Sequence, residues 1–260
     1  MATPRRTPAA APGQRKPKPK RTIEYPTSDG KPMAETDIHR DDMVDLIETL
    51  KDHFAAEPDV YISGNLLLFY EPGNRRKYVA PDVFFVRGVP KLPPRKYYLL
   101  WEEGKGPDVV IEITSKTTRK EDQTKKPILY RDVLRVSEYF RFDPTEEYLK
   151  PSLQGSRLEA GQYVPIAPVE GRLPSAILGL HLERRGTELR LYDPATGRCL
   201  PTRAERAREA EAAQQRAEQE RQREAEARQR AEQERQRIEQ ENERLRRELE
   251  TLRRKLPGGT

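Results

Sequence analysis

The chain has a single cysteine, Cys199, so no internal disulfide framework can stabilise its fold. It also has few apolar residues: 34% of the 260 residues are hydrophobic and 35% are charged. No apolar run approaches the length of a membrane span, and the N-terminal segment lacks the apolar stretch of a secretory signal. From these absences we expect a soluble, cytoplasmic protein of a bacterial type.

Acidic residues are missing from the first 21 positions, which carry seven Lys and Arg residues. Residues 203–260 carry 16 basic and 14 acidic residues, and the part between is close to neutral. The net charge of +6 therefore belongs to the two ends and does not indicate a basic nucleic-acid groove in the folded part. We expect residues 1–21 to form a disordered basic tail, with a nonspecific contact to nucleic acid as the alternative.

The apolar pattern of residues 22–202 predicts a folded domain of the α/β or α+β class. One helix is predicted to begin with Thr36 or Asp37 as its cap, and another across roughly 119–134. Strand-like segments are predicted at 59–70, 78–86 and 108–114, and shorter ones near 137–142, 147–152, 163–166, 177–182 and 187–192.

The last part of the chain is a charged repeat. QRAEQERQRE at 215–224 recurs as QRAEQERQRI at 229–238, a period of 14 residues, which is two heptads. With Leu245 at position d, the seam is apolar from Ile238 onward, and Asn242 falls at a position that fixes register in dimers. We expect residues 203–256 to form one long helix that pairs as a coiled coil in a homodimer, and residues 257–260 to be disordered. A lone charged helix is the alternative.

Two acids stand in otherwise apolar, strand-like segments. Asp82 lies in YVAPDVFFV and Glu112 in DVVIEIT. Carboxylates on neighbouring strands repel unless a cation lies between them, and Mg²⁺ prefers oxygen ligands while keeping several waters. Such an ion activates a water and stabilises charge on a phosphate, and a nearby lysine adds positive charge there. The pattern fits metal-dependent phosphodiester hydrolysis, with strand-borne acids in salt bridges as the alternative.

Several segments occur in the order and spacing of a known family. They are a helix carrying His39, then YVAPDVFFV, GPDVVIEITSKTT, the spaced residues Asp122, Lys126 and Tyr130, and SEYFRFDP at 137–144. Over about residues 36–195 the chain resembles the Uma-type restriction endonuclease family, a branch of the PD-(D/E)XK nuclease superfamily. The resemblance implies a mixed sheet flanked by helices, with Asp82 and Glu112 as ligands of Mg²⁺, for which Mn²⁺ can substitute. It also implies an endonuclease acting on nucleic acid, and we expect DNA as the substrate.

The basic residue of the site is where the chain departs from the superfamily pattern. A lysine often follows the second acid by two residues, but Thr114 occupies that position here. The resemblance points instead to Lys126 in the following helix. Because Pro127 follows at once and disfavours helical geometry before it, the helix is predicted either to begin at Pro127 or to kink there. Lys125 is therefore the reserve candidate.

The predicted catalytic residues are thus Asp82, Glu112 and Lys126. Other polar side chains are accessory candidates, each with a structural alternative as a turn, surface or packing residue: Ser115, Asp122, Lys125 and His39, with Glu48 as a third acid. A rival hypothesis is a non-catalytic module with a nuclease-type fold, in which the long helix binds a partner protein and the acids are residual.

Overall fold

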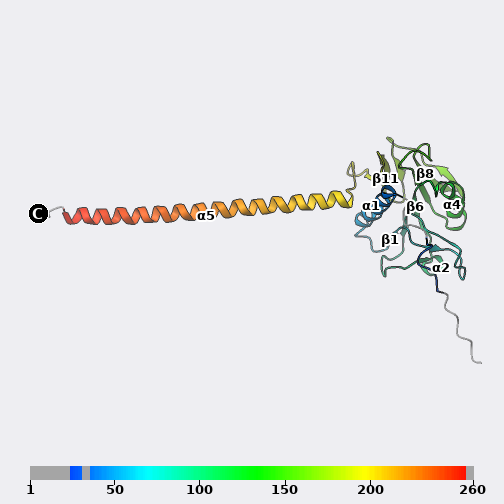
Figure 1. Ribbon diagram of the computed structural model, residues 1–260, viewed down its shortest axis with the longest axis horizontal. Coiled ribbons are helices and arrows are strands. Elements are labelled where there is room, and N and C mark those ends of the chain that lie inside the picture. The colour runs from blue at the N-terminus through cyan, green and yellow to red at the C-terminus, as the bar shows by residue number, and fades with distance from the viewer. Residues whose placement is uncertain (1–23, 31–35, 256–260) are drawn as a thin grey trace, which may run out of the picture.

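The structure, a computed structural model, describes residues 24–30 and 36–255. The predicted disordered segments 1–21 and 257–260 lie outside the described residues. Sheets and short helices form a body, and the long helix α5 (Arg203–Lys255) projects away from it as a single rod (Figure 1). The predicted class, a mixed sheet flanked by helices with a long C-terminal helix, is confirmed. Within 24–30 and 36–255, no helix combines the length and apolar character that a membrane crossing requires.

A six-stranded sheet forms the centre of the body. Its order is β1 (Val60–Ser63), β4 (Val83–Arg87), β6 (Val109–Ile113), β7 (Glu138–Phe142), β8 (Leu153–Glu159) and β9 (Gln162–Pro165). The sheet is mixed because β6 and β7 run parallel whereas the other neighbours are antiparallel. Val83 pairs with Ile111, so the residues beyond them, Asp82 and Glu112, are neighbours at the same edge of two adjacent strands.

Both faces of the sheet are buried at its central strands β4 and β6, which explains why these two strands are nearly continuous apolar runs. On one face, Val83 and Ile111 join a core with α1 (Asp37–His53) and with the strands of a second sheet. That sheet contains β10 (Leu173–Ser175), β11 (Leu180–Arg185), β12 (Glu188–Asp193) and β13 (Arg198–Cys199). On the other face, Phe84 and Val110 pack with Tyr130. A small third sheet holds β3 (Tyr78–Val79), β2 (Leu68–Phe69) and β5 (Tyr98–Leu99), followed by α2 (Leu100–Glu103).

The helix that carries His39 begins as predicted. Thr36 is the N-cap of α1, and its Oγ1 accepts a hydrogen bond from the His39 backbone N–H at 3.1 Å. This cap fixes the first turn and so the position of the His39 side chain.

The predicted helix across 119–134 is instead three short pieces, and its expected start or kink at Pro127 is wrong. The pieces are α3 (Arg119–Gln123), α4 (Lys125–Ile128) and a π-helical turn, η1 (Leu129–Val133). The break comes at Thr124, whose φ of −122° leaves the helical region. Pro127 then lies within the first turn of α4, where its missing N–H leaves no helical hydrogen bond unmade.

Some predicted strands also differ. The segment 59–70 divides at Gly64 into β1 and β2, and 78–86 divides at Pro81, which has no N–H for a ladder, into β3 and β4. The strand predicted at 147–152 is absent because the buried Asp143 carboxylate accepts hydrogen bonds from the N–H groups of Thr145, Tyr148 and Leu149. Those bonds hold the segment as a loop.

Candidate active site

The two predicted acids meet at the shared edge of β4 and β6. The backbone N–H of Asp82 donates to Glu112 Oε2 at 3.3 Å, and the Ile113 N–H donates to Asp82 Oδ2 at 2.8 Å. Glu112 is completely buried, whereas the Asp82 side chain keeps 15% of its surface exposed. Asp82 does not lie inside a strand, as the sequence suggested, but immediately before β4. Its position at the strand start lets its carboxylate face both Glu112 and solvent.

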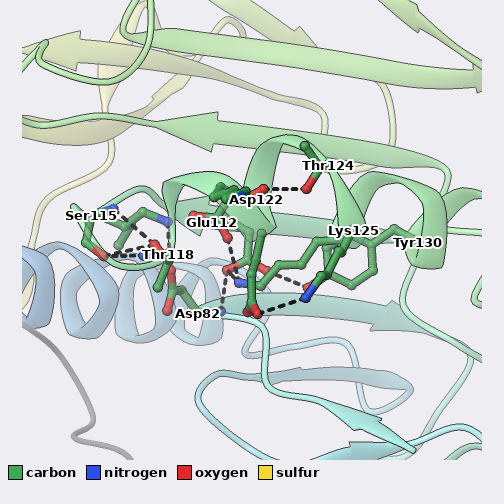
Figure 2. A network of polar contacts seen from close by, with 12 residues as sticks. Asp82, Glu112, Ser115, Thr118, Asp122, Thr124, Lys125 and Tyr130 are labelled. Carbon is green, nitrogen blue, oxygen red and sulfur yellow. Dashed lines mark hydrogen bonds and ion pairs between the residues drawn. The ribbon is translucent and has the colours of Figure 1, made fainter.

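Lys126 joins the acids from α4. Its Nζ lies 2.9 Å from Glu112 Oε2 and 2.7 Å from Oδ1 of Asp122, which is also completely buried. The sheet and the helices thus bring Asp82, Glu112 and Asp122 together (Figure 2). The Lys126 ammonium pairs with Glu112 and Asp122. We call this set of four residues the acidic cluster.

The acidic cluster contains three carboxylates and one lysine, and its members differ in the direction of their pKa shifts. Burial disfavours the charged form of Asp82, but His39 and Lys126 outweigh it and lower its pKa. Burial raises the pKa of Glu112, and the neighbouring carboxylates add to the effect although Lys126 opposes it. Burial would lower the pKa of Lys126, but the carboxylates raise it above its ordinary value. Lys126 therefore stays protonated across the neutral range.

Two aromatic hydroxyl groups hold the acidic cluster from within the core. The Tyr130 hydroxyl donates to Glu112 Oε1, and the Tyr139 hydroxyl donates to the Asp122 backbone carbonyl at 3.0 Å. The sequence pattern includes Tyr130 by its spacing but does not assign its hydroxyl to the site. The available signal was spacing, because Asp122, Lys126 and Tyr130 follow one another at intervals of four residues, as on one face of a helix.

His39 approaches Asp82 from the other side. Its Nε2 lies 3.2 Å from Asp82 Oδ1, and the ring is buried. A histidine in this position fixes the orientation of the Asp82 carboxylate and favours its charged form. The structure thus brings this accessory candidate into contact with the acidic cluster.

The other accessory candidates take different positions. Lys125 points outward with its side chain 80% exposed, and its Nζ lies 3.7 Å from Glu121. Ser115 holds the turn before α3, because its Oγ lies 2.9 Å from Thr118 Oγ1 and accepts the Thr118 N–H. Glu48 pairs with Lys51 on α1. Lys126 therefore contacts Glu112, whereas Lys125 does not.

The acidic cluster offers suitable donors for a hard divalent cation. Asp82 and Glu112 supply carboxylate oxygens, which Mg²⁺ prefers, and the excess of buried negative charge favours an added cation. In the described part of the chain, no three His, Cys, Asp or Glu side chains are arranged to hold a metal ion together. A bound Mg²⁺ would therefore have two protein carboxylates and complete its coordination with water, as this ion commonly does.

The acidic cluster opens onto solvent through a cavity of about 1280 Å³. His39, Asp82 and Lys126 line this cavity, whereas the carboxylates of Glu112 and Asp122 are buried beneath them. A molecule that enters the cavity can reach Asp82 and Lys126 directly.

Comparison with known proteins gives three findings. Residues 14–183 match the Uma2 family, described as "Putative restriction endonuclease". Among solved structures, the chain is similar to a putative nuclease belonging to DUF820 from Anabaena variabilis, with 16% identity and a TM-score of 0.44 over 59% of this chain and 80% of that chain. No curated protein matches the chain. The family match covers more than half of the chain and includes every residue of the acidic cluster.

Proposed function

Because the chain belongs to the Uma2 family of putative restriction endonucleases, we propose that it is a Mg²⁺-dependent endonuclease that hydrolyses phosphodiester bonds in DNA. The observation that carries the proposal is the convergence of Asp82, Glu112 and Lys126 beside an open cavity. Two carboxylates with an adjacent lysine supply the groups that metal-assisted phosphodiester hydrolysis needs.

Asp82 and Glu112 are the residues that would hold Mg²⁺ or Mn²⁺. When bound there, the ion supplies positive charge to the phosphoryl oxygens and lowers the pKa of water. The protein's part is to keep both carboxylates fixed: His39 and the Ile113 N–H each hold one oxygen of Asp82, and Tyr130 holds Oε1 of Glu112.

Lys126 acts as a fixed positive charge. In hydrolysis, the water oxygen forms a bond to phosphorus and releases its proton to solvent, the bond to one sugar oxygen breaks, and that oxygen takes up a proton from solvent. Negative charge grows on the phosphoryl oxygens during this exchange. The raised pKa of Lys126 keeps it protonated, so it stabilises that charge or orients the water and does not accept the water's proton. Asp122 holds the Lys126 Nζ in place, since the two are 2.7 Å apart.

The proposal is tested by plasmid nicking with the full-length protein in Mg²⁺, in Mn²⁺ and in EDTA. We expect metal-dependent nicking that Asp82→Asn and Glu112→Gln each reduce at least about a hundredfold, a loss typical of removing a group that stabilises the transition state. Glu48→Gln serves as a matched control, because this acid pairs with Lys51 away from the acidic cluster. Undiminished nicking by both cluster variants would refute the assignment of these residues.

The non-catalytic alternative makes the opposite prediction. Isothermal titration with Mn²⁺ would then show no binding that depends on Asp82 and Glu112, and the protein would act only through α5. Mn²⁺ binding that disappears in the Glu112→Gln variant argues against that alternative.

We also propose that α5 forms a homodimer through its distal end. Ile238, Leu245, Leu249 and Leu252 are each between 50% and 60% exposed along α5, whose other residues are mainly Glu, Arg, Gln and Ala. A second copy of the same helix would cover this apolar stripe, and Asn242 within it would set the register. The test of this pairing is given in the Discussion.

A further inference from the structure

The cavity beside the acidic cluster is much larger than the part of it that the acidic cluster lines. Its volume of about 1280 Å³ exceeds the range of about 300–1,000 Å³ that is typical of small-molecule sites. The acidic cluster occupies only one part of its lining. The residues that line the remaining walls of the cavity therefore indicate which substrate it binds.

Those walls are unusually apolar for a site beside buried acids. Tyr70 and Tyr78 contribute half-buried aromatic rings from the small third sheet. Ile128 and Val133, on the opposite side along α4 and η1, are 55% and 48% exposed. Exposed aliphatic and aromatic side chains in a concave site favour a ligand with flat, weakly hydrated faces.

Lysines line the same cavity at its exposed rim, together with the carboxylates of Asp29 and Glu121. Lys77 lies next to Tyr78 and follows the exposed Arg75 and Arg76, and Lys125 projects from α4 beside Ile128. Alternating lysines and apolar side chains match a chain of phosphates that carries planar bases. Such a combination is how single-stranded nucleic acid is bound, with bases stacked on side chains and the backbone held by cations.

A fully paired duplex fits this surface poorly. Binding to double-stranded DNA depends on neutralising many phosphates with Lys and Arg, yet residues 22–202 are close to neutral overall. In a duplex the faces of the bases are stacked on one another. They are therefore not available to contact the apolar side chains that line the cavity.

We propose that the cavity binds an unpaired stretch of DNA, so that the protein cuts single-stranded DNA in preference to fully paired DNA. This inference rests on the proposed nuclease function and specifies its substrate. Bases would contact Tyr70 and Ile128, while the scissile phosphate would lie where the cavity meets Asp82 and Lys126.

Binding and cutting are measured with the full-length protein and one fluorescein-labelled DNA strand, used alone and annealed to its complement. Fluorescence anisotropy in EDTA gives affinity without cleavage, and gel analysis after adding Mg²⁺ gives cutting. We expect the single strand to bind at least about tenfold more tightly than the duplex and to be cut faster. An RNA strand of the same sequence is included to test the assignment to DNA.

Variants test whether the walls are responsible. Tyr70→Ala is expected to weaken single-strand binding by about fivefold or more, in line with the loss of one base-stacking contact. Because Tyr70 is half-buried, Ile128→Ser provides a second variant at an exposed position that does not threaten the fold. Val169→Ser is the matched control, since Val169 is 50% exposed but does not line the cavity. Thermal melting by circular dichroism checks that each variant is folded.

The outcomes separate this inference from the function on which it rests. Duplex bound and cut as well as, or better than, the single strand would overturn the inference while leaving the nuclease function intact. Tighter binding of RNA would overturn the assignment to DNA. Unchanged affinity of the Ile128→Ser variant would overturn the placement of the strand in this cavity. If neither form of DNA is bound or cut, the proposed function and this inference fail together.

Discussion

Lys125 and Lys126 are adjacent in the sequence and have opposite surroundings. The Lys126 side chain is 14% exposed and pairs with two buried carboxylates, whereas that of Lys125 is 80% exposed. Removing one member of a buried ion pair leaves the other charge uncompensated, which is costly, whereas exposed pairs contribute little. The difference between these neighbours is therefore one of burial.

We predict that Lys126→Met lowers the free energy of unfolding by about 3 kcal/mol at pH 8 and abolishes nicking. The loss of stability should be smaller at pH 5, where Glu112 and Asp122 can take up protons. Lys125→Met, the matched control, should change stability by less than about 0.5 kcal/mol. Urea denaturation of both variants at the two pH values checks this, and equal effects of the two substitutions would contradict it.

The stability of the folded protein is expected to depend on pH through Asp42. This residue is buried in α1, its Oδ1 accepts the Leu189 N–H at 3.3 Å, and burial raises its pKa from 3.8 to about 7. Between these values the folded form holds a proton that the unfolded form has lost. The contribution of Asp42 to the free energy of unfolding is therefore greatest below about pH 4 and decreases as the pH rises to about 7.

We predict that Asp42→Asn removes this decline, since asparagine keeps an oxygen acceptor for Leu189 but cannot ionise. The variant should match the wild type near pH 4 and exceed it by about 2 kcal/mol at pH 8. Asp41→Asn, at the exposed neighbouring position, is the control. Thermal or urea unfolding across this pH range is the measurement. An Asp42→Asn variant that is less stable than the wild type at pH 8 would contradict the predicted gain in stability.

How far the sequence predicts the site can be judged from its residues. Asp82 and Glu112 stood out because a carboxylate in an apolar strand needs a partner, and the structure places them together. Glu138, however, is also a buried strand acid, and its oxygens are held by Arg157, Ser175 and the Ala176 N–H. Nothing in the sequence alone separates these two kinds of acid, because the partners of Glu138 come from distant elements.

At the scale of elements, the turn between β1 and β2 shapes the site without contributing a side chain. A Cβ atom at Gly64 would lie 1.9 Å from the Asp82 backbone oxygen, and the Asn65 N–H donates to the Pro81 carbonyl at 2.8 Å. The backbone before β4 is thus pressed against this turn. Such a long-range approach is not visible in sequence periodicity, which explains why 59–70 and 78–86 were each predicted as one strand.

We predict that Gly64→Ala displaces the backbone at Asp82 and reduces nicking at least about tenfold. The contact is to backbone rather than to a flexible side chain, so the methyl group cannot be accommodated by a rotamer change. Ser63→Ala at the adjacent position adds no atoms and is the control. Wild-type activity of a folded Gly64→Ala variant would show that the Asp82 position tolerates the shift.

At the scale of the whole molecule, α5 is joined firmly to the body. Thr202 Oγ1 accepts the Glu205 N–H while Glu205 Oε2 accepts the Thr202 N–H, a capping box that starts the helix. Glu205 also pairs with both terminal nitrogens of Arg190, and Arg206 pairs with Asp52 of α1. With 53 residues, the helix extends about 80 Å from this anchored end.

We predict that two copies of α5 pair in parallel, which would place both catalytic bodies at the same end of the dimer. In a Cys199→Ser background, Leu249→Cys should form a disulfide-linked dimer on mild oxidation, because identical a positions meet in a parallel coiled coil. Arg247→Cys, on the outer surface of the same pairing, should not cross-link. Light scattering should give twice the chain mass of 30.1 kDa. A monomeric mass, or cross-linking at both positions alike, would refute this arrangement.

The Lys126 ammonium is a built-in counterion for the carboxylates of the acidic cluster. Many small metal-binding folds unfold when the ion is withdrawn, because metal binding supplies part of their folding free energy. Here Lys126 pairs with both Glu112 and Asp122 and reduces their repulsion, so the metal-free protein should tolerate chelation, with a melting temperature in EDTA within about 2 °C of that in Mg²⁺. Differential scanning calorimetry measures this directly, and unfolding on chelation would contradict it. Under the proposed function, the supply of the ion would control catalysis but not the folding of the protein.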